Sequence, residues 1–276
     1  MKIALTGSSG RVGQGIVTRA LAQGHELVLI DRLDSPADQD PFIPFIRAEM
    51  SDYEAMVSAF AGCDGLIHMA AIPSPGRDPD HVIHNNNVVG SYNALRAAVE
   101  NGIKRVCQAS SVNAIGHAFS RKPRYDYFPL DEMHPNYSEE PYSLSKWICE
   151  EQGEAFARRY DDMVIASMRF HHVVPDRAIA ISIYGNNPNV DKHLWAWTRL
   201  DAAADACLLS LTAPFKGHEA FYIVAPNTIM DTPSLELAAR YFPEVPVIGD
   251  LSGNRSFFNS SKAERLLGWH HGEAER

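Results

Sequence analysis

The sequence predicts an α/β fold: a parallel, doubly wound sheet with helices on both faces and a small lobe formed by the C-terminal third of the chain. Short apolar runs with the length and branching of buried strands alternate with longer segments whose apolar residues recur every three or four positions. Repeated alternation of this kind is typical of parallel strands joined by right-handed helical crossovers. The rhythm changes after residue 170, which predicts the lobe.

The sheet domain is predicted over residues 1–170, with six strands and four helices. Each predicted strand is a short apolar run rich in branched residues, as expected of a sheet that is buried on both faces. The strands are 3–6, 26–31, 45–50, 66–69, 105–110 and 164–170. The helices, whose apolar residues share one face, are 12–22, 53–60, 82–100 and 143–159.

Residues 171–276 are predicted to form the small lobe, which packs over the sheet edge and is partly interleaved with the sheet. Residues 175–189 are polar, and Gly185, Asn186, Asn187 and Pro188 within them are interpreted as a turn. Thr232 as N-cap and Pro233 as first helical residue predict a helix to residue 241. The other predicted elements are a helix near 200–211, a strand at 220–224 and a helix at 261–267 that ends at Gly268.

The composition is that of an ordinary globular protein, with 276 residues, a net charge of −9 and 45% hydrophobic residues. The acidic balance argues against a broad nucleic-acid-binding face, and no apolar run reaches the ~18 residues that a membrane span needs. The N-terminal sequence lacks the pattern of a secretion signal, so we expect a cytoplasmic protein without nucleic-acid or membrane partners. The widely spaced Cys63, Cys107, Cys149 and Cys207 are expected to be buried free thiols.

A glycine-rich segment, residues 6–13, joins the first predicted strand to the first helix. Gly7 would permit a tight turn, Gly10 would let the backbone approach a pyrophosphate, and Gly13 would let the helix pack closely on the strand. The free N–H groups at the start of the helix favour phosphates. A plain strand-to-helix turn is the alternative, but the context predicts a dinucleotide site. Its residues here are Gly7, Ser9, Gly10, Arg11, Val12 and Gly13.

Asp31 ends the second predicted strand, 18 residues beyond Gly13. A carboxylate at this place accepts hydrogen bonds from the ribose hydroxyls and repels a 2′-phosphate, so it predicts NAD rather than NADP. Arg11 and Arg32 keep NADP open as the alternative, because either could reach a 2′-phosphate.

Tyr142 and Lys146 lie four residues apart at the head of a predicted helix, so their side chains share a face. The lysine should lower the pKa of the phenol, which could then accept a hydroxyl proton as hydride leaves the neighbouring carbon, or donate one in reverse. Ser110 and Ser111 end the fifth strand, at the edge where ligands of parallel sheets bind, and a hydroxyl there could hold the substrate oxygen. A surface Tyr–Lys pair and a capping serine are the alternatives.

The chain resembles the extended short-chain dehydrogenase/reductase family, the NAD-dependent epimerase/dehydratase group, in motifs spread over nearly its whole length. The most specific are TGSSGRVG at 6–13 and YSLSK at 142–146. The others, in family order, are Asp31, CDGLIHMAA at 63–71, NVVG at 87–90, ASSVNAIG at 109–116, PLDE at 129–132 and SKAERLLGW at 261–269. The resemblance implies a Rossmann-type dinucleotide-binding domain over 1–170, a substrate-binding lobe over 171–276, and a homodimer built on the helices 82–100 and 143–159.

The resemblance also implies roles for the matching residues. Ser111 is the catalytic serine, with Ser110 the less favoured neighbour, Tyr142 is the acid/base, and Lys146 binds the cofactor ribose. Glu49 stands where the family usually has an aspartate. The further cofactor-binding residues implied are Glu49, Met50, Met69, Ala70, Ala71 and Asn87.

The predicted reaction is NAD-dependent hydride transfer at a hydroxyl or carbonyl carbon of a sugar-like substrate, a uronate or an aldose. Val112 and Asn113 occupy the places where family dehydratases carry an Asp-Glu pair, so dehydration is disfavoured. The lobe is short for a nucleotide-sugar epimerase and loosely resembles that of hexuronate dehydrogenases. An epimerase with tightly bound NAD and a non-catalytic NAD(P)-sensing regulator are the alternatives, although such regulators commonly lose the tyrosine and the lysine.

A sugar-acid substrate would need a cation, for which Arg169 and Arg199 are the candidates; a structural ion pair is the alternative for Arg169. No metal site is expected, because the adjacent His171 and His172 would point to opposite faces of a strand and no carboxylate–histidine spacing supports one. Trp195 and Trp197 are interpreted as lobe core. The predicted substrate-binding residues are Ser74, Ser111, Asn113, Tyr142, His172 and Arg199.

Overall fold

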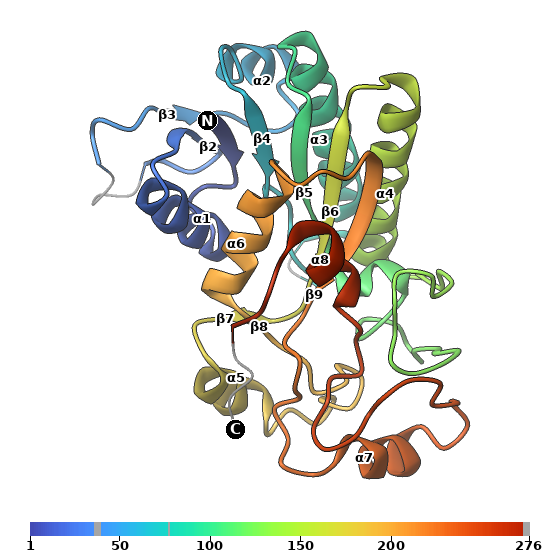
Figure 1. Ribbon diagram of the computed structural model, residues 1–276. Coiled ribbons are helices and arrows are strands. Elements are labelled where there is room, and N and C mark those ends of the chain that lie inside the picture. The colour runs from blue at the N-terminus through green and yellow to red at the C-terminus, as the bar shows by residue number, and fades with distance from the viewer. Residues whose placement is uncertain (36–39, 77, 273–276) are drawn as a thin grey trace.

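A seven-stranded parallel sheet forms the centre of the computed structural model, which describes residues 1–35, 40–76 and 78–272 (Figure 1). The strand order is β3-β2-β1-β4-β5-β6-β9. The chain therefore builds outwards from β1 in both directions, and the predicted doubly wound α/β fold is confirmed. The strands are β1 (Lys2–Thr6), β2 (Glu26–Asp31), β3 (Phe45–Arg47), β4 (Gly65–His68), β5 (Arg105–Ser111), β6 (Val164–Phe170) and β9 (Gly217–Ile223).

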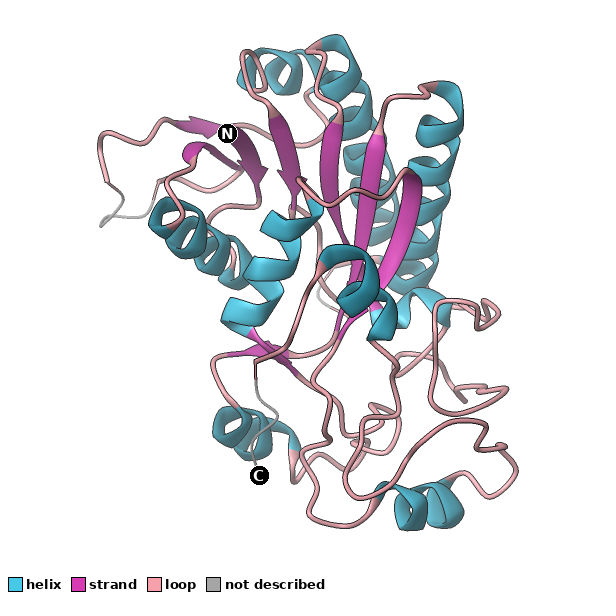
Figure 2. Cartoon of the chain, in the orientation of Figure 1, coloured by secondary structure: helices cyan, strands magenta, loops and turns pink. Residues whose placement is uncertain are grey.

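Helices cover both faces of the sheet, each over its own apolar core (Figure 2). One face packs against α1 (Arg11–Ala22), α6 (Leu200–Ser210) and α8 (Ser261–Leu267). The other face packs against α2 (Tyr53–Ala59), α3 (Asp80–Glu100) and α4 (Pro141–Arg159). Burial on both faces explains the continuous apolar strands of the sequence. Every helix in the described ranges is too short or too polar to cross a bilayer.

The C-terminal third is joined to the sheet and is not a separate body. Its strand β9 pairs with β6 over the whole length of both, and its helices α6 and α8 pack on one face of the sheet. Beyond the carboxyl ends of the strands lie the segments that carry the pair β7 (Val173–Val174) and β8 (Thr198–Arg199), and the helices α5 (Arg177–Tyr184) and α7 (Ser234–Tyr241). A separate apolar core there contains Trp195 and Trp197, both fully buried, as expected.

Several elements differ from the expectations in their bounds, and one helix was not predicted. Helix α5 lies in the polar segment 175–189, ahead of the predicted turn at 185–188, because the Asp176 side chain caps it by accepting the Ile179 N–H at 2.8 Å. Strand β3 ends at Arg47, three residues before its predicted end. Helix α7 starts one residue late, with Pro233 as its N-cap in place of Thr232. The four cysteines are buried and free, as expected.

Candidate functional site

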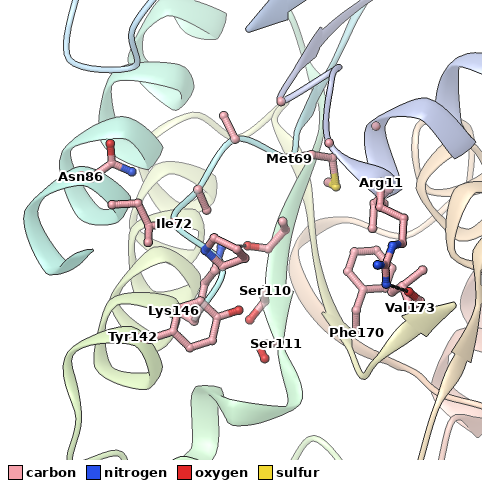
Figure 3. A pocket seen from close by; sticks show the side chains of 18 of the residues that line it. Arg11, Met69, Ile72, Asn86, Ser110, Ser111, Tyr142, Lys146, Phe170 and Val173 are labelled. Atoms are coloured by element: carbon pink, nitrogen blue, oxygen red, sulfur yellow. Dashed lines mark hydrogen bonds between the residues drawn. The ribbon is translucent and has the colours of Figure 1, made fainter. Parts of the chain in front are cut away.

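A cavity of about 690 Å³ lies at the carboxyl ends of β1 to β6, between the glycine-rich turn and α4 (Figure 3). Ligands of open α/β sheets bind at this edge, where the strand order reverses. Its lining includes most of the predicted site residues: Gly7, Ser9, Gly10, Arg11, Val12, Gly13, Asp31, Glu49, Met50, Met69, Ala70, Ala71, Ser110, Ser111, Asn113, Tyr142, Lys146 and His172.

The glycine-rich turn has no room for side chains at two positions. Gly7 has a φ of +69°, and a Cβ atom on it would lie 2.7 Å from the Ala70 backbone nitrogen. A Cβ atom on Gly13 would lie 2.3 Å from the Gly7 carbonyl oxygen. Gly10 is the N-cap of α1 and makes no side-chain cap. The first N–H groups of α1 therefore remain available to an anion such as a pyrophosphate.

The Asp31 carboxylate is held at the end of β2 by two backbone amides. Its oxygens accept the Ser9 N–H at 3.0 Å and the Leu33 N–H at 3.1 Å. Arg32 also lines the cavity. Arg11 instead donates to the Val173 carbonyl oxygen at 3.0 Å (Figure 3). Asp31 thus presents a carboxylate of fixed orientation to the cavity at the end of β2, with Arg32 next to it in the wall.

The start of α4 places Tyr142 and Lys146 on the cavity wall. Pro141 is the first helical residue, and the Glu140 carboxylate caps the helix by accepting the N–H groups of Tyr142 at 2.7 Å and Ser143 at 2.6 Å. Lys146 follows one turn later and donates from Nζ to the Ala109 carbonyl oxygen at 2.8 Å.

Ser111 ends β5 beside this pair (Figure 3). Its hydroxyl oxygen accepts the Asn113 N–H at 3.1 Å, and it also bonds to the phenol of Tyr142. Three hydroxyl and ammonium groups from β5 and α4 therefore converge on one side of the cavity.

Burial dominates the acid–base properties of this group. It raises the pKa of Tyr142 to about 12, and the hydrogen bond from Ser111 offsets only part of that rise. Burial also lowers the pKa of Lys146. The Lys146 ammonium lies 6.0 Å from the centre of the Tyr142 ring and is directed to Ala109. The expectation that Lys146 lowers the pKa of Tyr142 is therefore wrong for this arrangement, and the phenol is neutral at pH 7.

Asn87 does not line the cavity, in contrast to the expectation. It is buried inside α3, where its Oδ1 accepts the Ile72 N–H at 2.8 Å and its Nδ2 donates to the Ile72 carbonyl at 3.1 Å and to Ser145 Oγ at 3.0 Å. It thus ties the turn after β4 to α4. The preceding residue, Asn86, lines the cavity instead.

Neither predicted arginine reaches the cavity. Arg169 is fully buried and forms a bidentate pair with Glu150, at 2.9 and 2.7 Å. Arg199 pairs with Asp201 at 2.5 Å, because the pairing of β8 with β7 directs it to the start of α6. Ser74 follows the lining residue Pro73 but is not part of the wall. The structural alternative for Arg169 is therefore correct, and Arg199 and Ser74 are not brought to the cavity.

His171 and His172 were expected to point to opposite faces of a strand, and this expectation is wrong. Strand β6 ends at Phe170, so His171 and His172 are not strand neighbours, and His172 has a φ of +36°. Their rings lie 4.4 Å apart, and that of His193 lies 4.4 Å from that of His172. The cavity wall also contains His193 and the aromatic residues Phe119 and Tyr184, which no local pattern in the sequence marks as site residues.

Comparisons with known proteins agree with this architecture. Uronate dehydrogenase from Agrobacterium fabrum is 28% identical over 165 residues, 58% of this chain and 56% of that protein. UDP-glucose 4-epimerase from Lacticaseibacillus casei is 29% identical over 157 residues, 54% of this chain and 45% of that protein. The matches thus cover only about half of each relative's length.

Solved structures match over nearly the whole chain. UDP-glucose 4-epimerase from Thermotoga maritima, solved with UDP-glucose, aligns with 98% of this chain and 93% of its own at a TM-score of 0.73 and 22% identity. At that identity the likeness shows the fold alone. The model of the NAD dependent epimerase/dehydratase family, in contrast, matches the sequence over residues 3–218. The resemblance seen in the motifs is confirmed, and the chain belongs to the NAD dependent epimerase/dehydratase family.

Proposed function

We propose that this protein is an NAD-dependent oxidoreductase that transfers hydride between the nicotinamide and a hydroxyl-bearing or carbonyl carbon of a small sugar-like substrate. One observation carries the proposal. The glycine-rich turn, Asp31 and the Tyr142–Ser111–Lys146 group all border one continuous cavity. A dinucleotide that lies along this cavity would extend from Asp31 towards Tyr142.

The residues present fit NAD, which supplies the hydride acceptor or donor when bound. The α1 amides hold a pyrophosphate, and Asp31 accepts hydrogen bonds from a ribose. Ser111 orients the substrate oxygen beside Tyr142. In the reducing direction the neutral phenol of Tyr142 donates its proton to the carbonyl oxygen, and in the oxidising direction the same oxygen accepts the hydroxyl proton. Lys146 places a positive charge beside this exchange.

The substrate end of the cavity favours a neutral, polyhydroxylated molecule over a sugar acid. Its wall combines the amide of Asn113 and the imidazoles of His172 and His193 with the rings of Phe119 and Tyr184. Amides and neutral imidazoles bond to hydroxyls, and aromatic rings suit the apolar faces of a sugar. With Arg169 and Arg199 paired elsewhere, an aldose is a better candidate than a uronate.

A panel of aldoses, uronates and nucleotide sugars, each with NAD, tests the proposal by the absorbance of reduced nicotinamide. A dehydrogenase produces NADH in step with substrate consumed, and aldoses should be turned over at least as well as uronates. Epimer formation without net NADH would overturn the proposal in favour of an epimerase. Tight NAD binding without turnover of any sugar would favour a regulator.

We also propose a homodimer and a cytoplasmic location. Helices α3 and α4 pack side by side and expose Val89, Tyr92 and Leu144 on their outer face, and such apolar patches commonly mark interfaces. Four buried free cysteines suit a reducing compartment. Light scattering should give a dimer mass for the wild-type chain and a monomer mass for Tyr92→Asp. A monomeric wild-type chain would contradict the dimer.

A further inference from the structure

Three histidines from two separate loops meet at the cavity wall. His171 and His172 follow β6, and His193 comes from the loop before β8. One nitrogen of each ring lies within 4.8 Å of the corresponding nitrogens of the other two. His172 Nε2 and His193 Nδ1 are 3.0 Å apart. The cluster contains no carboxylate, and all three residues line the cavity.

His171 has no hydrogen-bond partner for either ring nitrogen, although its side chain is only 3% exposed. Buried polar groups in native proteins are almost always bonded, so an orphaned imidazole needs an explanation. In the neutral ring one of the two nitrogens is an acceptor, and no donor in the described chain bonds to it. A ligand between the three rings would satisfy it.

The backbone around the cluster is strained. His172, Leu194 and Trp195 have φ values of 36°, 50° and 52°, and no other non-glycine residue of the described chain has a positive φ. Such conformations are unfavourable for residues with a Cβ and are often found at functional sites. These strained residues are His172 itself and the two that follow His193. The rings of both His172 and His193 contact that of His171. Packing alone does not require three imidazoles to meet in this way.

We propose that His171, His172 and His193 bind a divalent transition-metal ion, Zn²⁺, through three ring nitrogens. Three imidazoles with a fourth position open to a cavity form a common zinc arrangement. An all-nitrogen ligand set selects zinc and its neighbours in the transition series and disfavours magnesium and calcium, which need oxygen ligands.

The surroundings suit three neutral, rigid ligands. Burial lowers the pKa of His172 to about 2 and that of His193 to about 4, so both rings are neutral at pH 7. Tyr184 stacks on His172 at 3.5 Å. Behind the cluster, His117 packs edge-on against His171 and bonds through Nδ1 to the hydroxyl of Tyr125 at 2.6 Å. The ring contact with His117 restricts the orientation of the His171 ring.

The open position would face the same cavity as Tyr142 and Phe119. A hydroxyl or carboxylate oxygen of the substrate could occupy it, which would anchor the end of the sugar remote from the reacting carbon, so the preference for an aldose over a uronate applies to the metal-free cavity. This role for the ion rests on the proposed function, whereas zinc binding itself does not.

Metal binding is tested on the whole chain after removal of metals with a chelator. Titration with Co²⁺ should give the absorption bands of a nitrogen-ligated ion at one equivalent, and Zn²⁺ should displace it. His193→Gln should weaken Zn²⁺ binding at least ~10-fold, in line with the losses that follow disruption of metal sites. His270→Gln, at an exposed histidine outside the cluster, is the matched control and should bind as the wild-type chain does.

Circular dichroism verifies that each variant is folded. His171 is fully buried, so His193→Gln and His172→Gln, at partly exposed positions, carry the test. Failure of the wild-type chain to bind one Co²⁺ or Zn²⁺, or an affinity in both of these variants equal to that of the wild-type chain, would overturn the proposal. NAD binding measured on the same samples separates this outcome from failure of the proposed function, because the histidines are not expected to hold the cofactor.

Discussion

The hydroxyl of Tyr142 is subject to two opposing influences. Burial raises its pKa to about 12, while the hydrogen bond with Ser111 lowers it. The balance favours the neutral phenol, which is a ready proton donor and a poor base. In the oxidising direction Tyr142 must accept a proton, so its pKa would have to be lowered by additional positive charge next to it. The position of Lys146 beside the same cavity is therefore more important than its present bond to Ala109 suggests.

Tyr142→Phe should lower turnover by about 10²- to 10⁴-fold, the usual contribution of a positioned general acid–base group. NAD affinity should change little, because the phenol moves a proton and is not a main cofactor ligand. Steady-state rates and NAD titrations check both expectations, with Tyr241→Phe on α7 as the control outside the cavity. A Tyr142→Phe enzyme that kept more than about a tenth of the rate would exclude this role.

Asp31→Ala should narrow the preference for NAD over NADP, because the carboxylate would face the 2′-phosphate. Asp31→Asn removes the charge, but its amide oxygen can still accept a hydrogen bond from the backbone N–H of Ser9 or of Leu33. This variant therefore separates the effect of the charge from that of the loop conformation. Fluorescence titration with NADH and NADPH gives the affinities. Tighter binding of NADPH by the wild-type chain would refute the predicted preference and point to Arg32.

At the scale of elements, features that depend on residues close in sequence were predicted correctly, whereas features that depend on tertiary contacts were not. The glycine turn, β2 with Asp31, and the start of α4 depend on residues close in sequence, and each lies as expected. Arg169 could not be assigned, because its partner Glu150 comes from a helix that only the folded sheet brings near. Helix α5 was missed because turn-forming residues after it concealed the Asp176 cap.

The pair Arg169–Glu150 links β6 to α4 and also reaches the site, since Ser110 donates to the same carboxylate. Both side chains are almost completely buried, so removal of one leaves an uncompensated charge. Arg169→Met should lower the free energy of unfolding by ~3–5 kcal/mol, whereas a double variant with Glu150→Met should recover much of that loss.

Urea unfolding measures these differences. Arg96→Met, which breaks the exposed pair with Glu100 on α3, is the control and should cost at most ~1 kcal/mol. Equal losses from Arg169→Met and Arg96→Met would show that the buried pair has no special role in joining β6 to α4.

At the scale of the whole molecule, several histidines are buried at separate places in the fold, which composition alone did not reveal. The sequence contains 12 histidines, and their number gives no sign of which become buried. His68 bonds to Thr6 at the end of β1, and His271 accepts the Arg199 backbone N–H. Each depends on pairs of segments distant in sequence. Burial lowers the pKa of these two to about 3 and about 4, respectively.

The stability of the metal-free protein should therefore fall steeply in mild acid. An unfolded histidine titrates near pH 6.5, whereas His68, His172, His193 and His271 stay neutral in the folded protein until pH 4 or below. Below pH ~6.5 the unfolded state binds more protons, so each such histidine costs ~1.4 kcal/mol of stability per pH unit. This stability is fully present above pH ~6.5 and is lost as the pH falls towards the folded pKa values.

Four such residues would remove a typical folding free energy of ~5–15 kcal/mol within about one to three pH units. Urea midpoints measured from pH 7.5 to 4.5 should be nearly constant at the upper end and decline below pH ~6.5. In His271→Gln the amide oxygen can still accept the hydrogen bond from the Arg199 N–H. This variant should reduce the slope of stability against pH by the contribution of one histidine, ~1.4 kcal/mol per pH unit. Below pH ~4.5 carboxylates begin to titrate, so the measurement stops there. Urea midpoints that stay constant down to pH ~4.5 would contradict the prediction. They would mean that these imidazoles are hydrated and take up protons in the folded state as they do in the unfolded state.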